Sequence, residues 1–118
     1  MLKNQDVEYV QGDTFTITVI LNVDAPPPFN PVGSVGHWTL SRYATSDALL
    51  VKTTTTGDVT FVQDPVTQLY AMVVSLTKED TEALPPGFYF HTAKVIETGV
   101  EPYTVMRGAF KLVATPDP

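Results

Sequence analysis

The stretch DTFTITVILN, residues 13–22, decides the fold class. Its apolar side chains recur at every second position, at Phe15, Ile17, Val19 and Leu21, and threonines alternate with the first three of them. Successive side chains of an extended chain point to opposite sides, so the two sets lie on opposite faces. We therefore predict an antiparallel strand with one face in a core and a threonine-bearing face toward solvent.

The same period of two recurs along the chain. Trp38 and Leu40 alternate with polar neighbours in a second predicted strand. Further strands are predicted around Val59 and Phe61, from Tyr70 to Leu76, from Phe88 to Glu97 and from Tyr103 to Val113. About seven strands, glycine-containing turns between them and a Trp38 that suits a core predict an immunoglobulin-like antiparallel β-sandwich, with residues 1–118 as one domain.

Two features modify this pattern near residue 76. The strand from Tyr70 to Leu76 also carries Ala71 and Val73 on its second side, so we expect it to be covered on both sides. After it, residues 77–84 read TKEDTEAL, which predicts a short helical turn capped by Thr77 and ended by prolines. We expect this turn to carry the chain from one sheet to the other.

Composition excludes several kinds of function. The chain of 118 residues has no cysteine, which rules out disulfides, thiolate nucleophiles and zinc–thiolate sites. Its 13 acidic and 7 basic residues give a net charge of −6, which argues against a phosphate-binding surface and hence against nucleic acid. No stretch approaches the roughly 18 apolar residues that span a bilayer, and the first residues have no signal-peptide pattern. We expect no membrane contact and synthesis in a cytoplasm.

A proline-rich loop at residues 24–33, DAPPPFNPVG, is the predicted partner-contact segment. Consecutive prolines favour a stiff polyproline conformation that loses little entropy on contact. One interpretation is a loop that closes the open end of the sandwich over Phe29; the other is an arm that contacts a neighbouring subunit. The candidate contact residues are Pro26, Pro27, Pro28, Phe29 and Pro31. Residues 114–118 are predicted to form an extended C-terminal tail.

Candidate catalytic and metal-binding residues are few. We expect His91 to be a packed core or rim residue and His37 to be an ordinary surface residue. The sequence contains no nucleophile elbow, phosphate-binding loop or His-Glu-x-x-His motif, so no catalytic residue, cofactor or metal is predicted. Five scattered acids are possible calcium ligands, but turn-forming roles suit them better. These acids are Asp6, Glu8, Asp13, Asp58 and Asp64.

Several other side chains allow two interpretations. The run Thr53 to Thr56 suits an exposed strand end and turn. Alternatively, it is a sheet edge whose threonines prevent unwanted strand pairing, or whose backbone is offered to a partner strand. Phe29, Trp38, Tyr43 and Tyr103 suit core positions, or alternatively a sugar-stacking platform.

The last predicted strand holds two further candidates. Gly108 in its interior indicates a bulge or the close approach of another backbone. We predict an ion pair between Arg107 and either Glu97 or Glu101 across the last hairpin.

Three segments together carry a family resemblance. Residues 74–89, VSLTKEDTEALPPGFY, end a strand in Leu-Thr, continue in an acidic helical turn and begin a strand with Leu-x-Pro-Gly-x-Tyr. Residues 103–112, YTVMRGAFKL, contain Arg-Gly-x-Phe, and residues 12–15 read Gly-Asp-Thr-Phe. The chain thereby resembles small immunoglobulin-like virion proteins of tailed bacteriophages, and is similar to the N-terminal domain of phage baseplate upper proteins. The proline-rich loop departs from that pattern.

The resemblance implies a non-enzymatic structural protein located in the virion. Because the chain is small, acidic and has two extended segments, we favour a capsid decoration or cement protein that contacts the major capsid protein and self-associates in the particle. A neck, tail or baseplate accessory protein is the alternative within the same class. A carbohydrate-binding module for host adhesion is the alternative from a different class.

Overall fold

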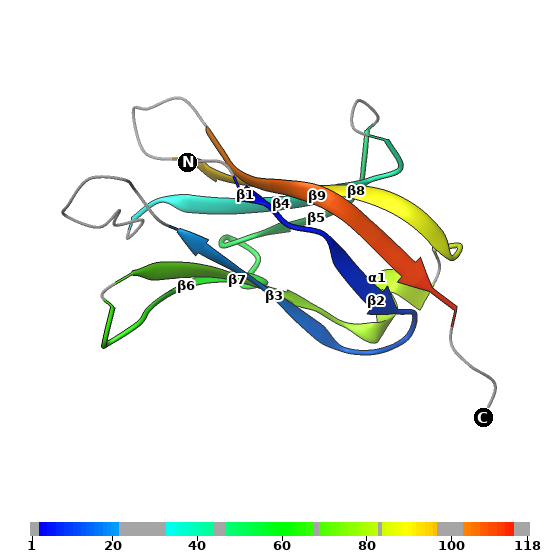
Figure 1. Cartoon of the computed structure of the whole chain (residues 1–118), viewed down its shortest axis with the longest axis horizontal. Helices are drawn as coiled ribbons and strands as arrows, with labels where there is room; N and C mark the ends of the chain where they lie inside the picture. Colours follow the sequence, from blue (N-terminus) through cyan, green and yellow to red (C-terminus); the bar gives the residue numbers. More distant parts are fainter. Residues whose placement is uncertain are drawn as a thin grey trace.

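A computed structural model describes residues 3–21, 33–43, 47–67, 69–82, 84–96 and 103–114. Two β-sheets pack face to face as an all-β sandwich, which confirms the predicted fold class (Figure 1). The larger sheet contains β1 (Lys3–Asn4), β2 (Val7–Val10), β4 (Val35–Ser41), β5 (Ala48–Thr53), β8 (Gly87–Ile96) and β9 (Tyr103–Val113). The smaller sheet contains β3 (Phe15–Leu21), β6 (Val59–Gln63) and β7 (Tyr70–Leu76), and α1 (Lys78–Glu82) follows β7.

The alternating stretch that predicted the fold forms β3. It pairs antiparallel with β7, so that Ile17 lies opposite Val74 and Val19 opposite Met72. These four side chains are buried and face Trp38 and its neighbours in the larger sheet, as one continuous core. The period of two therefore identified the core face correctly at Ile17, Val19 and Leu21, whereas Phe15 at the start of the strand is 37% exposed.

The sheets contain strands that the sequence did not predict. The described residues form nine strands, and the unpredicted ones are β1, β2 and β5. β1 and β2 are consecutive short stretches that pair parallel with β9. In β5, Leu49, Leu50 and Val51 hide the alternation, because this edge strand has apolar side chains on both faces.

Two aromatic residues show the packing typical of immunoglobulin-like domains. Trp38 on β4 is fully buried at the centre of the sandwich. Tyr89, near the start of β8, is also buried, and its hydroxyl donates to the Pro85 carbonyl 2.5 Å away. This bond has the pattern of a tyrosine corner, in which the penultimate strand is tied to the backbone that leads into it.

The predicted helical turn is confirmed, with shorter bounds than residues 77–84. α1 spans Lys78–Glu82, and the Thr77 amide donates to Asp80 Oδ2 at 2.7 Å. This is the acidic half of a capping box, in which a side chain three residues into the helix satisfies the amide at its start.

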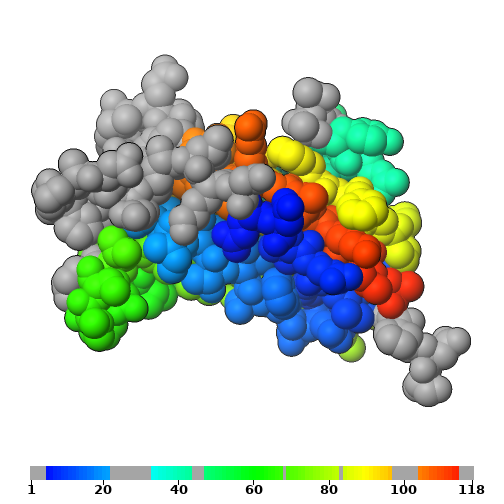
Figure 2. Space-filling view, viewed as in Figure 1, coloured from blue at the N-terminus to red at the C-terminus, as the bar shows by residue number. Residues whose placement is uncertain are grey.

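The N-terminal strand closes one edge of the sandwich (Figure 2), where dark-blue β2 lies between β9 and β3. At the junction of β1 and β2, Gln5 donates from its side chain to the Thr18 carbonyl of the other sheet at 3.1 Å. A Cβ on Gly108 would lie only 2.0 Å from the Gln5 carbonyl oxygen. The predicted close approach of a backbone to Gly108 is confirmed.

Candidate docking surfaces

Some of the sequence predictions fall outside the described residues. Pro26, Pro27, Pro28, Phe29 and Pro31 all do, and so does the tail from residue 115 onward. The side chain of Tyr103 and the acids Glu97 and Glu101 also lie outside the description. The arm, the tail and the ion pair of Arg107 therefore stay predictions.

His91 is a core residue, as predicted. Its ring is fully buried, receives a hydrogen bond from Trp38 Nε1 on Nδ1 at 3.2 Å, and contacts the Gln5 carbonyl through Nε2 at 2.7 Å. Because the indole only donates and the carbonyl only accepts, His91 is neutral with its proton on Nε2. Burial lowers the pKa of His91, against the opposing effects of the Gln5 carbonyl and Asp6. Trp38 is equally buried, so it cannot belong to a sugar-stacking surface.

The scattered acids take structural roles. Asp64 accepts from the Val66 amide at 2.7 Å and from the Thr67 amide at 3.1 Å, which is an Asx turn. Asp6 accepts from the Ala109 amide at 2.9 Å and so fixes the N-terminal strand to β9. Among the described residues, no three His, Asp or Glu side chains gather in a way that could hold a metal ion. The described part of the chain also contains no helix long and apolar enough to cross a membrane.

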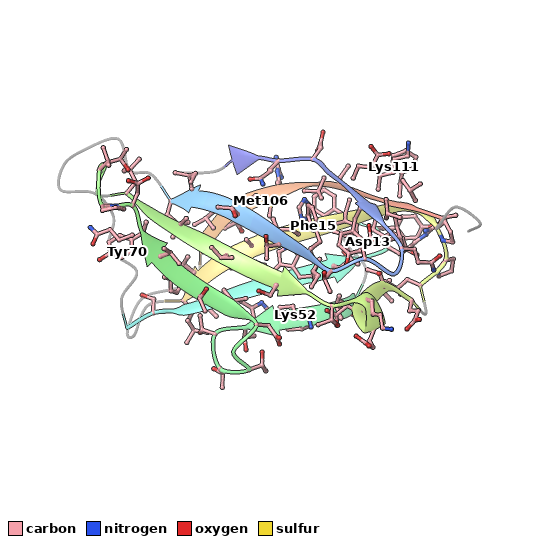
Figure 3. The ribbon with its side chains drawn as sticks, turned by 90° about the horizontal axis from the view of Figure 1, so that it is seen from below. Asp13, Phe15, Lys52, Tyr70, Met106 and Lys111 are labelled. Atoms are coloured by element: carbon pink, nitrogen blue, oxygen red, sulfur yellow. The ribbon has the colours of Figure 1, made fainter. Side chains whose placement is uncertain are left out.

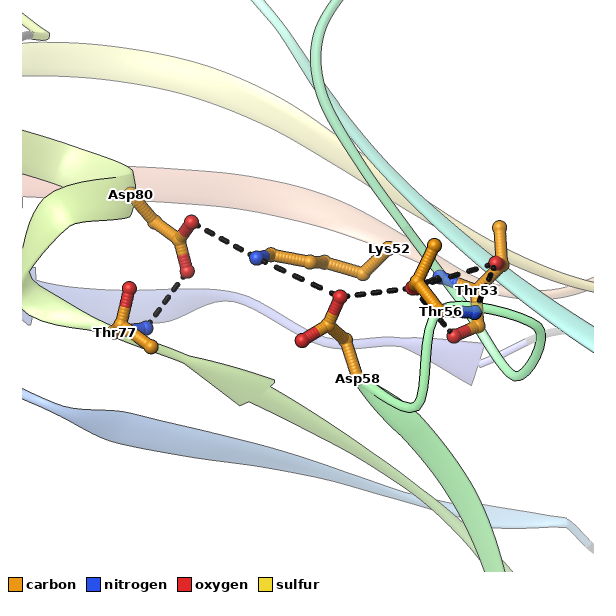
Figure 4. Close-up of polar contacts among 6 residues, drawn as sticks. All are labelled: Lys52, Thr53, Thr56, Asp58, Thr77 and Asp80. Atoms are coloured by element: carbon orange, nitrogen blue, oxygen red, sulfur yellow. Dashed lines mark hydrogen bonds and ion pairs between the residues drawn. The ribbon is translucent and has the colours of Figure 1, made fainter.

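A charged clamp joins the two sheets on the side of β5 (Figure 4). Lys52 points inward, and its Nζ lies 2.8 Å from Asp80 Oδ1 and 3.9 Å from Asp58 Oδ2. Burial would raise the pKa of Asp80, but hydrogen bonds from Lys52 and Thr77 lower it overall. An inward-pointing charge is also a known guard of an edge strand, which fits the position of Lys52 on β5.

The run of threonines beside this clamp forms a turn. Thr56 Oγ1 lies 2.8 Å from Asp58 Oδ2 and 3.0 Å from the Thr53 carbonyl oxygen, and its one hydroxyl proton is donated to one of these acceptors. The strand-end and turn interpretation of residues 53–56 is thereby confirmed.

The outer face of the larger sheet carries an aromatic ridge, which we define as Arg42, Tyr43, Phe88 and Lys111. Phe88 and Tyr43 are 66% and 67% exposed. Arg42 donates to the Phe88 carbonyl at 3.3 Å, and its guanidinium lies 5.0 Å from the centroid of the Tyr89 ring. Lys111 Nζ lies 5.8 Å from the centroid of the Phe88 ring. Phe88 thus projects from β8 with Lys111 near its ring, while Arg42 bonds its backbone carbonyl.

Two hollows flank Phe88. One hollow, of about 510 Å³, lies toward Arg42 and Tyr43. The other, of about 290 Å³, lies toward Glu8 and Lys111, which form an ion pair with 3.6 Å between Lys111 Nζ and Glu8 Oε1. Exposed aromatic rings and arginines are enriched at protein interfaces, so the ridge is a candidate docking surface.

Sequence reasoning did not single out Phe88, although a signal existed. In a strand where Tyr89 and His91 face inward, Phe88 must face outward. Of the four aromatic residues named above, the structure describes the side chains of Trp38 and Tyr43, and Tyr43 is the exposed one of these two, beside a hollow.

The outer face of the smaller sheet forms an apolar groove of about 600 Å³. Figure 3 views the molecule from this side, with β7 between β3 and β6. The groove is lined by Thr18, Ile20, Val62, Gln63, Asp64, Pro65, Thr67, Leu69, Ala71 and Val73. We expected a second layer over Ala71 and Val73, but within the described residues their side of β7 is the floor of this groove.

Charges divide unequally between the two layers. Lys94, Arg107 and Lys111 are exposed on outward positions of β8 and β9, and Arg42 lies at the same face. In contrast, Asp58, Asp64, Glu79, Asp80 and Glu82 all belong to segments that precede or follow strands of the smaller sheet. Asp6 and Glu8 also lie beside the ridge, and Glu8 pairs with Lys111, so this face carries both signs of charge with bases in excess among the described residues.

His37 also lies on the outer face of the larger sheet. It is opposite Lys94 in the register of β4 and β8, and it is half-buried where we predicted an ordinary surface residue.

No protein-family model matches the chain, and no curated protein is significantly similar to it in sequence.

Proposed function

We propose that this protein is a non-enzymatic structural component of a tailed bacteriophage particle, which decorates the capsid surface by binding the major capsid protein. The proposal begins from the resemblance of residues 12–15, 74–89 and 103–112 to immunoglobulin-like virion proteins. The observation that carries it furthest is the aromatic ridge, because it presents Phe88 of β8 and Tyr43, two residues beyond β4, to solvent.

The chemistry of the ridge suits a protein partner. Aromatic side chains supply large contact areas with little conformational entropy to lose, and an arginine beside them adds directional hydrogen bonds. A small domain gains avidity when many copies bind a repeating surface, so each single contact can be modest. The overall charge of −6 disfavours nucleic acid as the partner.

Copy number in purified particles tests the proposal. Quantitative mass spectrometry of the phage that encodes this chain should find hundreds of copies per particle. Several to tens of copies would instead favour a neck, tail or baseplate accessory protein. Absence from purified particles would overturn both structural roles.

Two variants test the part played by the ridge. Phe88→Ser should lower the occupancy of particles, because it removes the exposed ring without disturbing the core. Val66→Ser is the matched control, since Val66 is apolar and 88% exposed but belongs to neither surface. Deletion of residues 26–31 tests the predicted arm in the same assay, and unchanged occupancy would end that hypothesis.

A second candidate function rests on the hollow between Tyr43 and Phe88. Exposed rings beside an arginine are able to stack on a sugar and to bind its hydroxyl groups. A carbohydrate-binding module for host adhesion should give a glycan-array signal that Tyr43→Ser abolishes. An array without any signal would remove this candidate.

A further inference from the structure

The buried ring of His91 joins the core to the short segment that precedes β2. Trp38 Nε1 donates to Nδ1 of this ring at 3.2 Å, and Nε2 donates to the Gln5 carbonyl at 2.7 Å. The ring also meets Phe110 edge to face, with 5.7 Å between the ring centroids. Both ring nitrogens are therefore engaged, and the neutral form with its proton on Nε2 is the form that fits both partners.

A second proton on His91 would find no acceptor in this arrangement. It would lie on Nδ1, where it faces the Trp38 indole N–H, and two donors that face each other cannot form a hydrogen bond. The resulting cation would be fully buried, and a buried charge without a close partner is costly. Protonation of His91 therefore favours an arrangement in which the ring reaches water.

The charges around His91 do not offset this cost. Among the described residues, Asp6 is the charged side chain that acts on the ring, and burial lowers the pKa of His91 in spite of it. The inward-facing neighbours of the ring on β4, on β9 and in the smaller sheet are apolar. Arg107 on β9 is exposed, and the inward-pointing Lys52 belongs to β5, at the edge of the sheet opposite β1.

The segment that covers His91 is held by hydrogen bonds. We define this junction segment as residues 3–6, which comprise β1, the half-buried Gln5 and the exposed Asp6. β1 pairs with β9 over two residues. Three further bonds join the Gln5 amide to the Arg107 carbonyl at 2.9 Å, the Gln5 side chain to the Thr18 carbonyl at 3.1 Å and Asp6 Oδ1 to the Ala109 amide at 2.9 Å.

β2, which follows the junction segment, is anchored more firmly. It pairs with β9 over four residues, and its Tyr9 is buried. The Tyr9 ring lies 5.1 Å from the centroid of Phe15 and 5.8 Å from that of Phe110. Because this aromatic packing is lost only if β2 itself detaches, the junction segment is able to open by itself.

We propose that protonation of His91 at mildly acidic pH releases the junction segment from β9, whereas β2 and the two sheets stay in place. Release removes the Gln5 backbone from Nε2 of His91 and admits water to the ring. It also leaves the edge of β9 at Met106 and Arg107 without the partner it has in the closed form. The inference does not depend on the proposed function, because it rests on contacts within one chain.

Hydrogen exchange of single amides, followed by NMR on the 118-residue chain, tests the inference. The amides of Gln5 and Ala109 report the junction segment, whereas those of Gln11 and Ser75 report the end of β2 and the smaller sheet. Between pH 7.5 and pH 5.5, the protection factors of Gln5 and Ala109 should fall at least about threefold, toward a limit of about tenfold set by an ordinary histidine pKa of about 6.5. Those of Gln11 and Ser75 should not change. Constant protection at Gln5 and Ala109, or an equal fall at all four amides, would overturn the inference.

Two matched variants identify the group that takes up the proton. His91→Gln keeps a donor and an acceptor but does not titrate, so it should abolish the pH dependence at Gln5 and Ala109. Asp6→Asn keeps the acceptor for the Ala109 amide and removes the nearby carboxylate, so the pH dependence should persist. Persistence in His91→Gln, or loss in Asp6→Asn, would overturn the inference.

A measurement on the wild-type chain needs no variant. The ¹⁵N chemical shifts of the His91 ring at pH 7.5 distinguish the two neutral tautomers, and they should place the proton on Nε2. A proton on Nδ1 would contradict the bond from Trp38 and overturn the latch mechanism, even if His91→Gln fails to fold.

Discussion

Replacing Gly108 with alanine tests how the N-terminal strand is attached to the sandwich. Gly108 lies opposite His91 in the register of β8 and β9, under the junction of β1 and β2. An added Cβ would lie 2.0 Å from the Gln5 carbonyl oxygen and 3.0 Å from Asp6 Oδ1. Real Cβ atoms essentially never come within 3.0 Å of such neighbours, so the Gln5 backbone would have to move by about 1 Å.

The cost of that movement follows from the bonds it disturbs. The junction is held by His91 Nε2 to the Gln5 carbonyl at 2.7 Å, the Gln5 amide to the Arg107 carbonyl at 2.9 Å, and the Ala109 amide to Asp6 Oδ1 at 2.9 Å. At about 1 kcal/mol for each bond, their loss costs about 3 kcal/mol. Alanine in place of glycine in a strand returns about 0.5–1 kcal/mol through backbone entropy. The net destabilisation should be about 2 kcal/mol.

Urea unfolding followed by tryptophan fluorescence measures this change. Trp38 is the single tryptophan and is fully buried, so its emission reports loss of the core. Gly57→Ala is the control: its Cβ meets no atom within 4 Å, but its φ of +83° is unfavourable for alanine and costs about 1 kcal/mol. If Gly108→Ala is as stable as the wild type or more so, the close approach of Gln5 is refuted.

Four further predictions concern stability. Lys52→Met should destabilise the fold by about 3 kcal/mol in thermal or urea unfolding, because it leaves Asp80 buried without its cation. The pKa of Asp80 is lower in the folded than in the unfolded state, so its ionised carboxylate stabilises the fold above the unfolded pKa. This stabilisation is lost as pH falls through the folded pKa, and Asp80→Asn should therefore flatten the loss of stability below about pH 4. The pKa of His91 is lower in the folded than in the unfolded state, so the unfolded state binds the proton at higher pH and the free energy of unfolding should fall from about pH 7 downward. His91→Gln keeps a donor and an acceptor, and it should reduce this pH dependence in unfolding measured at several pH values. Tyr89→Phe should cost about 1 kcal/mol through loss of the bond to Pro85, and an unchanged melting temperature would contradict the tyrosine corner.

Much of the fold was predictable because it depends on local periodicity. The alternation in residues 15–21 placed Ile17, Val19 and Leu21 in the core, where they are. The acidic turn after Leu76 also followed from local chemistry, since a cap and a following proline act within a few residues. The edge strand β5 was not predicted because it has apolar side chains on both faces. Leu50 faces inward and Leu49 and Val51 are exposed, so apolar and polar residues do not alternate.

The candidate surfaces were less predictable than the core. Periodicity assigns Phe88 to the outward face of β8, but it does not show that Arg42, 46 positions away, bonds its carbonyl or that Lys111 lies near its ring. The predicted cover over Ala71 and Val73 was wrong for the described residues, because an apolar second face can equally line a groove.

The sequence by itself determined which side chains of the alternating strands face the core, where the chain turns between sheets and that Gly108 marks either a bulge or a backbone close by. These properties depend on neighbours along the chain and on the volume of single side chains. Only the tertiary structure decided what lies beside what: Gln5 against Gly108, Lys52 between Asp58 and Asp80, and the ridge and groove on opposite faces. Such contacts join residues far apart in sequence, and strand order and register place them together.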